Sequence, residues 1–211
     1  MADLRSYIFL DSLQPQVASF FATVSQGFLP IAGQASLFVE ISPGMDINRV
    51  TDVALKCTKV LPGMQIIERL YGLLEIHSES QADVRAAGAA ILDALGLKEE
   101  DRYKPVIYSS SVIRMINDYH TMLINRTRHG NMILPGHSLF TLEVAPAAYA
   151  AFAANEAEKT ADINILEIRA FGSFGRVYIG GEEKDVDVAW KAAEAAINSI
   201  SGRAMKGGSS D

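Results

Sequence analysis

Apolar and polar residues alternate along several short segments of the chain, and the clearest of them predicts a β-strand. Leu37, Val39 and Ile41 point to one face of this strand, whereas Glu40 lies on the other face. The proline two residues after Ile41 ends the strand, because proline cannot donate a hydrogen bond to a neighbouring strand. Beyond it, apolar residues spaced at three and four positions predict a helix over about residues 47–58.

The same patterns along the whole chain predict two runs of elements, each in the order β-α-β-α-β-β-α. The first run has strands at residues 7–10, 37–41, 65–70 and 73–77, and helices at about 16–26, 47–58 and 83–95. The second run has strands at residues 107–113, 140–144, 164–170 and 176–179, and helices at about 119–128, 148–160 and 185–200. Pro62 and Gly63 predict a turn before the strand at 65–70.

The second run repeats the first. Adding 103 to a position pairs matching residues: Gly27 with Gly130, Gly33 with Gly136, Glu40 with Glu143, Pro43 with Pro146, Ala54 with Ala157 and Lys56 with Lys159. After a three-residue deletion the offset becomes 100 and pairs Arg69 with Arg169, and Gly72 with Gly172. The chain is therefore predicted to hold two homologous domains.

We place the first domain at residues 1–103 and the second at residues 104–203. The polar segment 97–105 is the expected linker, and residues 204–211, rich in Gly and Ser, are expected to form a flexible tail. The element order predicts an α+β fold: two tandem ferredoxin-like domains, each an antiparallel sheet flanked by helices.

Composition and charge exclude several classes of protein. Nineteen Lys and Arg residues against 25 Asp and Glu residues give a net charge of −6, so no basic surface for nucleic acid is expected. No apolar run is long enough to cross a membrane, and no N-terminal signal segment is present. A single cysteine, Cys57, fits a reducing compartment, and we expect a cytoplasmic protein.

The sequence offers no set of catalytic residues. The four histidines lack metal-ligand spacing, and no nucleophile elbow is present. The expected place of Cys57 is the buried face of the helix at 47–58, where it is a core thiol. The glycines of Gly172-Ser173-Phe174-Gly175 flank a strand and predict a hairpin turn rather than a phosphate loop. We therefore expect a protein that is not an enzyme and that holds no cofactor or metal.

One predicted strand carries adjacent charges. In the segment IIERLYG, residues 66–72, Glu68 and Arg69 point to opposite faces, so at least one of them projects toward a surface that its apolar neighbours would bury. The second copy keeps the cation at Arg169 but has Glu167, one position before the site aligned with Glu68.

Several long segments resemble a known family. They are LRSYIFLDSLQPQ, SQGFLP, INRVTDVALK, IIERLYG, NEAEK and EIRAFGSFGR. Over about residues 4–203 the chain resembles the tandem-domain bacterial microcompartment shell proteins, in particular the circularly permuted, double-layer kind found in carboxysomes. The resemblance implies that each domain is a permuted shell domain and that the protein is a structural component of the carboxysome shell, which serves CO2 fixation around Rubisco and carbonic anhydrase.

The resemblance also implies an assembly. Three chains would form a trimer whose six domains make a pseudohexameric tile beside other carboxysome shell proteins, and two trimers would stack face to face around a chamber. A wide central pore would open and close, with Glu68 and Arg69 as its gate. Ribulose bisphosphate, 3-phosphoglycerate and bicarbonate are the proposed traffic.

Charge repulsion bears on such a gate. Three arginines at about 5 Å cost roughly 0.8 kcal/mol per pair in water and more in a confined pore. A closed pore therefore needs Glu68 of one chain to accept hydrogen bonds from Arg69 of another, and an open pore solvates both. The alternative from the residues alone is a static salt bridge between subunits.

Further residues are candidates for the pore rim, namely Gly72, Glu167, Arg169, Gly172, Ser173 and Phe174. The two glycines serve either a hairpin turn or a close backbone approach. Phe174 either narrows the pore or packs on its own domain. Lys56 and Lys159 either contact a neighbouring tile or form pairs within a helix, such as Asp52 with Lys56.

Two other functions remain possible from the sequence. Pairs of ferredoxin-like domains also occur in soluble regulators that bind small molecules, and such a protein would be a compact monomer or dimer. An enzyme is disfavoured because the catalytic residues are missing.

Overall fold

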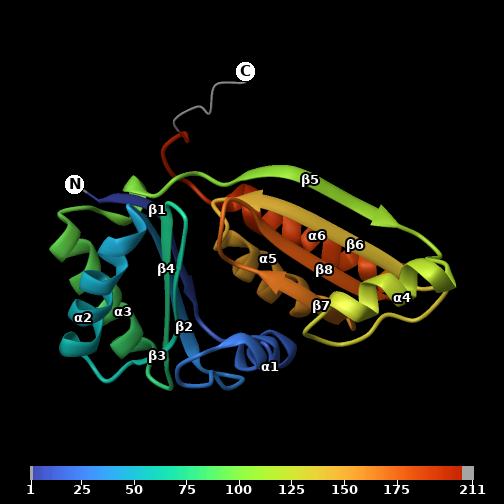
Figure 1. Ribbon diagram of the computed structural model, residues 1–211, viewed down its shortest axis with the longest axis horizontal. Helices are drawn as coiled ribbons and strands as arrows, with labels where there is room; N and C mark the ends of the chain where they lie inside the picture. The colour runs from blue at the N-terminus through green and yellow to red at the C-terminus, as the bar shows by residue number, and fades with distance from the viewer. Residues whose placement is uncertain (1, 206–211) are drawn as a thin grey trace.

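The computed structural model describes residues 2–205 and contains two four-stranded antiparallel sheets (Figure 1). The first domain comprises β1 (Asp3–Leu10), α1 (Pro15–Val24), β2 (Ala35–Ser42), η1 (Gly44–Asp46), α2 (Ile47–Cys57), β3 (Leu61–Glu68), β4 (Tyr71–Ser78) and α3 (Gln81–Leu95). The linker holds the short helix η2 (Glu99–Asp101). The second domain comprises β5 (Val106–Ile113), α4 (Asp118–Thr127), β6 (Ser138–Ala145), α5 (Tyr149–Glu158), β7 (Asn164–Arg169), β8 (Gly175–Gly181) and α6 (Glu183–Ser199).

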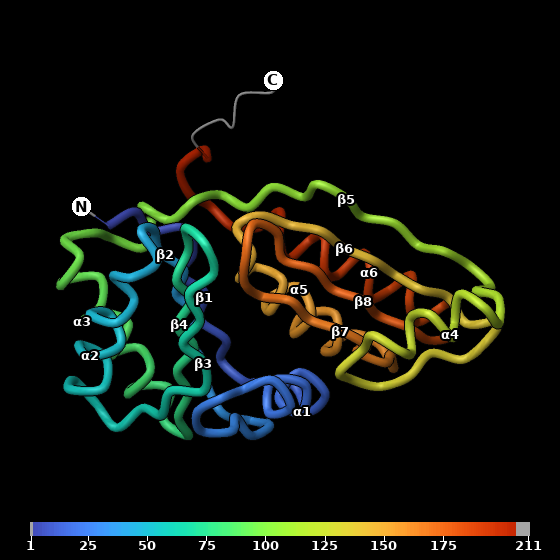
Figure 2. Tube along the Cα trace, in the orientation of Figure 1, coloured from blue at the N-terminus to red at the C-terminus, as the bar shows by residue number. Residues whose placement is uncertain are grey.

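Both sheets have the same topology. Their strand orders are β1-β2-β4-β3 and β5-β6-β8-β7, with every neighbouring pair antiparallel. The longer helices α2 and α3 cover one face of the first sheet, and α5 and α6 cover the matching face of the second (Figure 2). The predicted α+β fold, with two tandem antiparallel sheets flanked by helices, is confirmed. The boundary that we place after residue 103 falls in the linker between α3 and β5.

The prolines that were predicted to end strands do so. β2 ends at Ser42 before Pro43, and β6 ends at Ala145 before Pro146; both prolines follow cis peptide bonds. In contrast, the turn predicted at Pro62 and Gly63 is wrong, because these residues lie inside β3.

The edge position of β3 explains that error. β3 pairs only with β4 in its sheet, and a bulge interrupts the pairing between Pro62 and Met64, so the missing N–H of the proline breaks no regular ladder. On the outer side, the N–H of Gly27 donates to the carbonyl of Gly63, and that of Phe28 to Pro62, both at 2.9 Å. The loop that contains Gly27 and Phe28 thus covers the free edge of β3 at the residues where a turn was predicted.

The prediction that Cys57 is a core thiol is also wrong. Val50 and Ala54 of α2 are buried, but Cys57 is the last residue of the helix, and its side chain is exposed. Its Sγ lies 3.7 Å from the carbonyl of Ala86 on α3. Helical spacing places Cys57 on the same face of α2 as the buried Val50 and Ala54. The helix ends at Cys57, however, and at this last residue that face is no longer covered.

The two domains share one hydrophobic core. α1 belongs to the first domain but packs against α5 and β7 of the second (Figure 1). Phe20 is only 2% exposed and lies in the same buried cluster as Ala153 and Ile165. A separate buried cluster beneath α2 and α3 belongs to the first domain alone. The interface between domains is therefore built like a protein interior.

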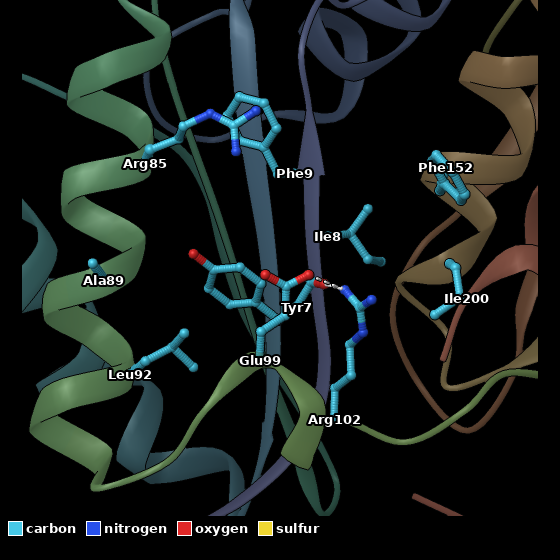
Figure 3. Close-up of a pocket in the computed structure, with 10 residues that line it drawn as sticks. All are labelled: Tyr7, Ile8, Phe9, Arg85, Ala89, Leu92, Glu99, Arg102, Phe152 and Ile200. Carbon is cyan, nitrogen blue, oxygen red and sulfur yellow. Dashed lines mark hydrogen bonds and ion pairs between the residues drawn. The ribbon is translucent and has the colours of Figure 1, made fainter. Parts of the chain in front are cut away.

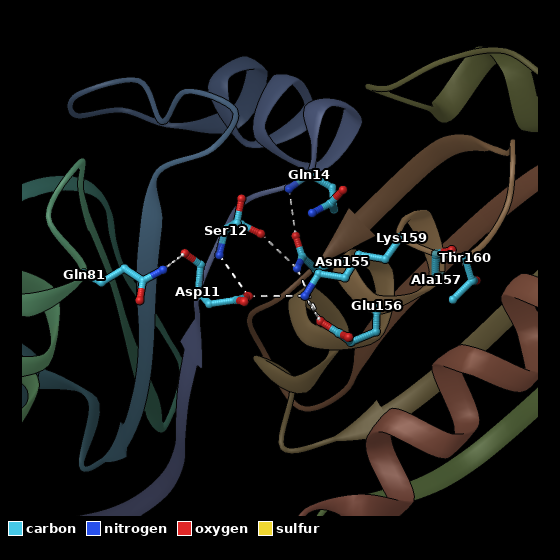
Figure 4. A network of polar contacts seen from close by, with 9 residues as sticks. All are labelled: Asp11, Ser12, Gln14, Gln81, Asn155, Glu156, Ala157, Lys159 and Thr160. Atoms are coloured by element: carbon cyan, nitrogen blue, oxygen red, sulfur yellow. Dashed lines mark hydrogen bonds and ion pairs between the residues drawn. The ribbon is translucent and has the colours of Figure 1, made fainter.

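Polar contacts line the edge of this shared core (Figure 4). The Asn155 side-chain oxygen accepts a hydrogen bond from the N–H of Gln14 at 2.9 Å. Lys159 reaches across the boundary to Asp11 at 3.2 Å and also pairs with Glu156 at 2.7 Å. Lys159 therefore contacts the other domain of its own chain.

The lysine that matches it in the first copy differs. Lys56 pairs with Asp52 one helical turn earlier, at 2.8 Å, and both side chains are exposed. The two lysines that the repeat aligns thus have different partners within one chain.

A buried carboxylate joins the two domains. Glu40 is 1% exposed, accepts a hydrogen bond from Arg5 Nε at 2.6 Å, and accepts a second one from the N–H of Ala148 at 3.1 Å, just before α5. Burial raises the pKa of Glu40, and Arg5 and the backbone N–H oppose that rise. Loss of Arg5 would leave the Glu40 charge buried without compensation, and loss of the N–H of Ala148 would remove a donor from its second oxygen.

The C-terminal part of the chain returns to the first domain and clasps the linker. Arg203 Nη2 pairs with Asp3, and its Nε donates to the carbonyl of Asp101 at 2.6 Å. Tyr103 is 5% exposed and donates to Asp3 at 2.6 Å. The linker is thus packed and hydrogen-bonded. Of the predicted tail, residues 204 and 205 are described and 206–211 lie outside the described residues.

The clasp predicts the effect of one substitution. Arg203→Ala removes the ion pair with Asp3 and the bond to Asp101, which should lower the free energy of unfolding by about 1–2 kcal/mol and Tm by roughly 2–6 °C. Differential scanning calorimetry measures this change. Lys191 on α6 is exposed and forms no ion pair within residues 2–205, so Lys191→Ala is the control and should leave Tm unchanged. Equal Tm values for the two variants would show that the clasp does not stabilise the chain.

Candidate functional site

The β3–β4 hairpin of the first domain lies against the β7–β8 hairpin of the second. The two hairpins occupy corresponding places in the repeat and enclose a small cavity of about 200 Å³. The cavity is lined by Glu68, Arg69, Arg169, Phe171, Gly172, Ser173, Phe174 and Arg176. Three arginines and one glutamate thus meet where the two domains meet.

One ion pair connects the two hairpins. The Arg169 guanidinium lies 3.4 Å from both carboxylate oxygens of Glu68, and its centre lies 5.0 Å from the ring centre of Phe171. Both charged side chains are partly exposed, so this pair is weak. A weak pair can be exchanged for another at low cost.

Gly172 allows the close approach of the hairpins. Its φ of +94° lies in the region that favours glycine, and an added Cβ would lie 3.2 Å from the Glu68 carboxylate. The turn of the second domain therefore presents bare backbone to the acid of the first.

Arg69 is the free cation of the group. Its φ of +54° is uncommon for a residue with a side chain and places it at the tip of the β3–β4 hairpin. The side chain is exposed and forms no ion pair within the described part of the chain. Arg69 is thus available to a group from outside the chain.

Six of the eight residues named from the sequence lie together in this cavity: Glu68, Arg69, Arg169, Gly172, Ser173 and Phe174. Phe174 packs edge-on against Tyr108 with ring centres 4.9 Å apart, which is the packing alternative considered above. Gly175, the last residue of the Gly-Ser-Phe-Gly segment, begins β8, so these residues form the predicted hairpin turn.

The other two residues lie elsewhere. An added Cβ at Gly72 would collide with the backbone of Gly44, so this glycine serves a close approach within its own domain. Glu167 accepts hydrogen bonds from the N–H and the ring of His129 at 2.9 Å and fastens that loop to β7. Neither residue lines the charged cavity.

Arg176 is a member of the site that the sequence reasoning missed. It lies opposite Arg169 in the β7–β8 ladder, and its Nε donates to Glu143 at 2.8 Å. Its place directly after the Gly-Ser-Phe-Gly segment was a usable signal, because residues on both sides of a tight hairpin face each other.

The residues of this site do not suggest catalysis or metal binding. No group of three or more His, Cys, Asp or Glu side chains suited to a metal occurs in residues 2–205. An excess of guanidinium groups over carboxylates favours anions, because guanidinium binds carboxylate and phosphate oxygens in a fork. Across the same residues, no helix has the length and apolar character needed to span a bilayer.

The fold and the paired hairpins define a tandem-domain microcompartment shell protein, and comparisons with known proteins agree. A family model described as the CsoS1D N-terminal domain matches residues 4–101. Carboxysome shell protein CcmP of Synechococcus elongatus is 57% identical over 205 residues, which cover 97% of this chain and 96% of that protein. Carboxysome shell protein CsoS1D of Hydrogenovibrio crunogenus is 48% identical over 204 residues, covering 96% of this chain and all of that protein.

Solved structures share the whole architecture. The fused permuted hexameric shell protein MSM0275 of the RMM microcompartment has a TM-score of 0.91 at 47% identity, covering 94% of this chain and 99% of its own. The double ringed trimeric shell protein MSM0271 has a TM-score of 0.93 at 40% identity, covering 97% and 100%. This chain therefore belongs to the family of carboxysome shell proteins that includes CcmP and CsoS1D, and its relatives are shell proteins rather than enzymes.

Gly172 offers a direct test of the hairpin contact. Gly172→Ala should lower the free energy of unfolding by about 1–2 kcal/mol, because the new Cβ strains the backbone and crowds Glu68. Urea unfolding followed by circular dichroism measures the loss. Ser173→Ala, in the same turn, is the control and should cost less than about 0.5 kcal/mol. If both variants unfold at the same urea concentration as the parent chain, the left-handed turn is not required.

Proposed function

We propose that this chain is a carboxysome shell tile: three copies form a pseudohexameric ring around a central pore, and Glu68 and Arg69 gate that pore. Each chain contains one interface between its two domains. The surface that each domain contributes to it has a counterpart in the other domain, and there the counterpart is exposed; this observation carries the proposal. A head-to-tail contact between chains covers them.

α1 and α4 are the first pair of corresponding surfaces. Phe20 of α1 is 2% exposed because α5 and β7 cover it. Its counterpart in the repeat, Leu123 of α4, is 58% exposed, and Tyr119 and Met122 beside it are exposed as well. In Figure 1, α4 lies at the free end of the second domain with no element beyond it. Such an apolar patch suits a protein interface.

α5 and α2 are the second pair. Ala148, just before α5, is fully buried, whereas its counterpart Met45 is 68% exposed. Asn155 is buried against the first domain, whereas its counterpart Asp52 is exposed. We therefore expect α4 of one chain to pack on α2 of the next, in the way that α1 packs on α5.

Repetition of this contact gives the ring. A head-to-tail interface produces a closed ring or an open filament. Closure at three chains, hence six domains, agrees with the relative that is described as a double ringed trimeric shell protein. By the same analogy two rings stack face to face, and the assembly takes its place among other shell proteins in the carboxysome.

The gate follows from competition for one carboxylate. Glu68 pairs with Arg169 of its own chain at 3.4 Å, while Arg69 forms no ion pair within residues 2–205. In the closed pore Glu68 accepts hydrogen bonds from Arg69 of a neighbouring chain; in the open pore Glu68 stays with Arg169, and water solvates Arg69. Two mutually exclusive pairings provide the two states that a gate requires.

The charges of the rim favour anions as traffic. Arg69, Arg169 and Arg176 outnumber Glu68 in the cavity. Ribulose bisphosphate, 3-phosphoglycerate and bicarbonate carry the carboxylate, carbonate or phosphate oxygens that guanidinium groups bind. Neutral gases gain nothing from these groups, so the open pore selects for the charged metabolites of CO2 fixation.

Leu123 tests the assembly. Leu123→Asp places a charge in the contact between chains, and we expect a folded monomer of 22.9 kDa instead of a ring of three chains or a stack of six. Size-exclusion chromatography with light scattering gives the mass, and circular dichroism shows that the chain stays folded.

Val188 supplies the matched control. It is an exposed apolar residue on α6, at 47% exposure, and lies outside the α4 patch. Val188→Asp should leave the mass of the assembly unchanged. A monomeric parent chain, or a Leu123→Asp variant that still forms the parent assembly, would contradict the proposed interface.

The gate has its own test. Glu68→Ala leaves the three Arg69 side chains without an acceptor, so their repulsion should leave nearly all pores open in electron micrographs. Glu167→Ala removes an acid of the neighbouring hairpin that lies outside the cavity, and it should leave the ratio of open to closed pores unaltered. Closed pores retained in Glu68→Ala would rule out the exchange of partners.

A further inference from the structure

A cavity of about 230 Å³ lies inside the second domain, at the end of α4. Every described residue of its lining belongs to α4, to β7 or to β8, or follows α4 directly, so the first domain takes no part in it. Arg169 and Arg176 line both this cavity and the charged cavity described above, so the two cavities share this pair of residues. We refer to the new one as the α4 cavity.

The first domain has apolar residues at the corresponding places. Counted from the bulge in each hairpin, Ile66 pairs with Leu73 where Arg169 pairs with Arg176. Leu73 is 2% exposed and lies in the shared core, and Ile66 packs against that core. Strand pairing thus aligns Arg169 with Ile66, whereas the sequence offset aligned it with Arg69. A charged group in a place suited to the core costs free energy unless something offsets it.

Arg128 brings a third guanidinium group to the α4 cavity, and this one has no acid as a partner. It directly follows α4 and is partly buried. Its Nη1 donates to the carbonyl of Gly130 at 2.7 Å, and its Nε donates to the side-chain oxygen of Asn125 at 3.2 Å. Both acceptors are neutral, and Nη2 forms no hydrogen bond within residues 2–205. A donor of a cation without a counter-charge thus remains for a ligand.

The other two arginines add further free donors. Each uses one nitrogen for an acid that does not line the α4 cavity: Arg169 for Glu68 at 3.4 Å and Arg176 for Glu143 at 2.8 Å. Their remaining nitrogens form no hydrogen bond in the described part of the chain. Glu167 is the acid of the described lining, and it already accepts two hydrogen bonds at 2.9 Å from the loop after α4. Free donors therefore exceed free acceptors, which suits an anion.

The negative charges nearby are weaker than the positive ones. The C-terminal end of α4 carries about half a negative charge, and Glu167 carries one. Three guanidinium groups outweigh both within the lining, although Glu68 and Glu143 offset part of the charge of their own arginines. Because no acid offsets Arg128, we expect an anion to lie nearest to Arg128.

A larger cavity between the two domains shows the contrast (Figure 3). There Arg102 is paired with Glu99 at 2.7 Å and Arg85 stacks on Phe9 at 3.7 Å, so both cations already have partners. Figure 3 shows Glu99 and Arg102 directed toward each other. In that cavity the acid pairs with a cation of the same lining, whereas Glu167 forms its ion pair with a histidine outside the lining of the α4 cavity.

The volume of the α4 cavity limits the size of the ligand. Sites for drug-sized molecules span about 300–1,000 Å³. A cavity of about 230 Å³ instead suits an inorganic anion together with a few waters, each of which takes about 30 Å³.

We propose that the α4 cavity binds a small inorganic oxyanion of the kind of phosphate, sulfate or bicarbonate. Arg128 donates to it from the loop after α4, and Arg169 and Arg176 donate from the facing strands, because guanidinium groups match the oxygens of such anions. The anion offsets the charge of Arg128 and joins the end of α4 to the β7–β8 hairpin. This inference goes beyond the proposed function and requires neither a ring nor a pore.

Calorimetric titration of the full chain tests the binding. The probes are sodium phosphate, sodium sulfate and sodium bicarbonate, with sodium chloride of equal ionic strength as the match. We expect at least one oxyanion to bind with saturation, one per chain, and chloride not to bind, and the three titrations show which oxyanion binds best. Absence of saturation with all three, or the same heat from chloride, would overturn the proposal.

Arg128→Gln locates the anion. The loss of a charged donor should weaken binding about tenfold. Arg126→Gln is the matched control, because it removes the same charge from the same end of α4 but does not line the cavity. It should change the dissociation constant less than twofold. Equal dissociation constants for the two variants would place the anion elsewhere.

Arg176→Gln repeats the test from the facing strand, because Arg128 also holds the carbonyl of Gly130. This variant should weaken binding at least fivefold, and circular dichroism shows for each variant that the chain is folded. Arg69 lines the charged cavity but not the α4 cavity, so Arg69→Gln separates the two. Binding that is lost in Arg69→Gln and kept in Arg128→Gln would place the anion in the charged cavity and overturn the proposal.

Discussion

The buried carboxylate of Glu40 fixes how the two domains of this chain sit against each other. It accepts one hydrogen bond from Arg5 of its own domain and another from the N–H of Ala148 in the second domain. Both bonds are buried and costly to break, so they help to hold the first sheet beside the start of α5. The position of the β3–β4 and β7–β8 hairpins, and hence the contact of Glu68 with Arg169, follows from that placement.

Glu143, the counterpart of Glu40 in the repeat, lies in a different environment. Glu143 is partly exposed and pairs with Arg176 of its own sheet, whereas Glu40 is buried beside the start of α5. Its side of the second domain carries the uncovered α4, with Leu123 exposed where Phe20 is buried. We propose that the same interface recurs between chains. Divergence between the copies leaves one acid for three arginines in the charged cavity of each chain.

Much of the fold could be predicted from the sequence because its signals are local. Alternation fixed the strands, helical spacing the helices, and Pro43 and Pro146 the ends of β2 and β6. The errors came from tertiary context. The sequence around Pro62 is typical of a turn, but Pro62 lies in an edge strand that a loop covers. The helical spacing predicts a buried Cys57, but the helix ends at this residue and leaves it exposed.

The site was only partly predictable for the same reason. Adjacent charges in IIERLYG identified Glu68 and Arg69, but the partner of Glu68 within the chain, Arg169, lies about 100 residues away, and only the repeat placed it in a corresponding hairpin. Glu167 was named because it aligned near Glu68, yet a strand residue shifted by one position faces the other side of its sheet, and its carboxylate holds His129.

The most direct test of this account is a cryo-electron microscopy structure of the assembled native chain. The account predicts three chains around a three-fold axis, with α4 of each chain on α2 of the next, and Arg69 of one chain beside Glu68 of another wherever the pore is closed. A two-fold dimer, or a ring whose contacts leave Leu123 in solvent, would contradict it.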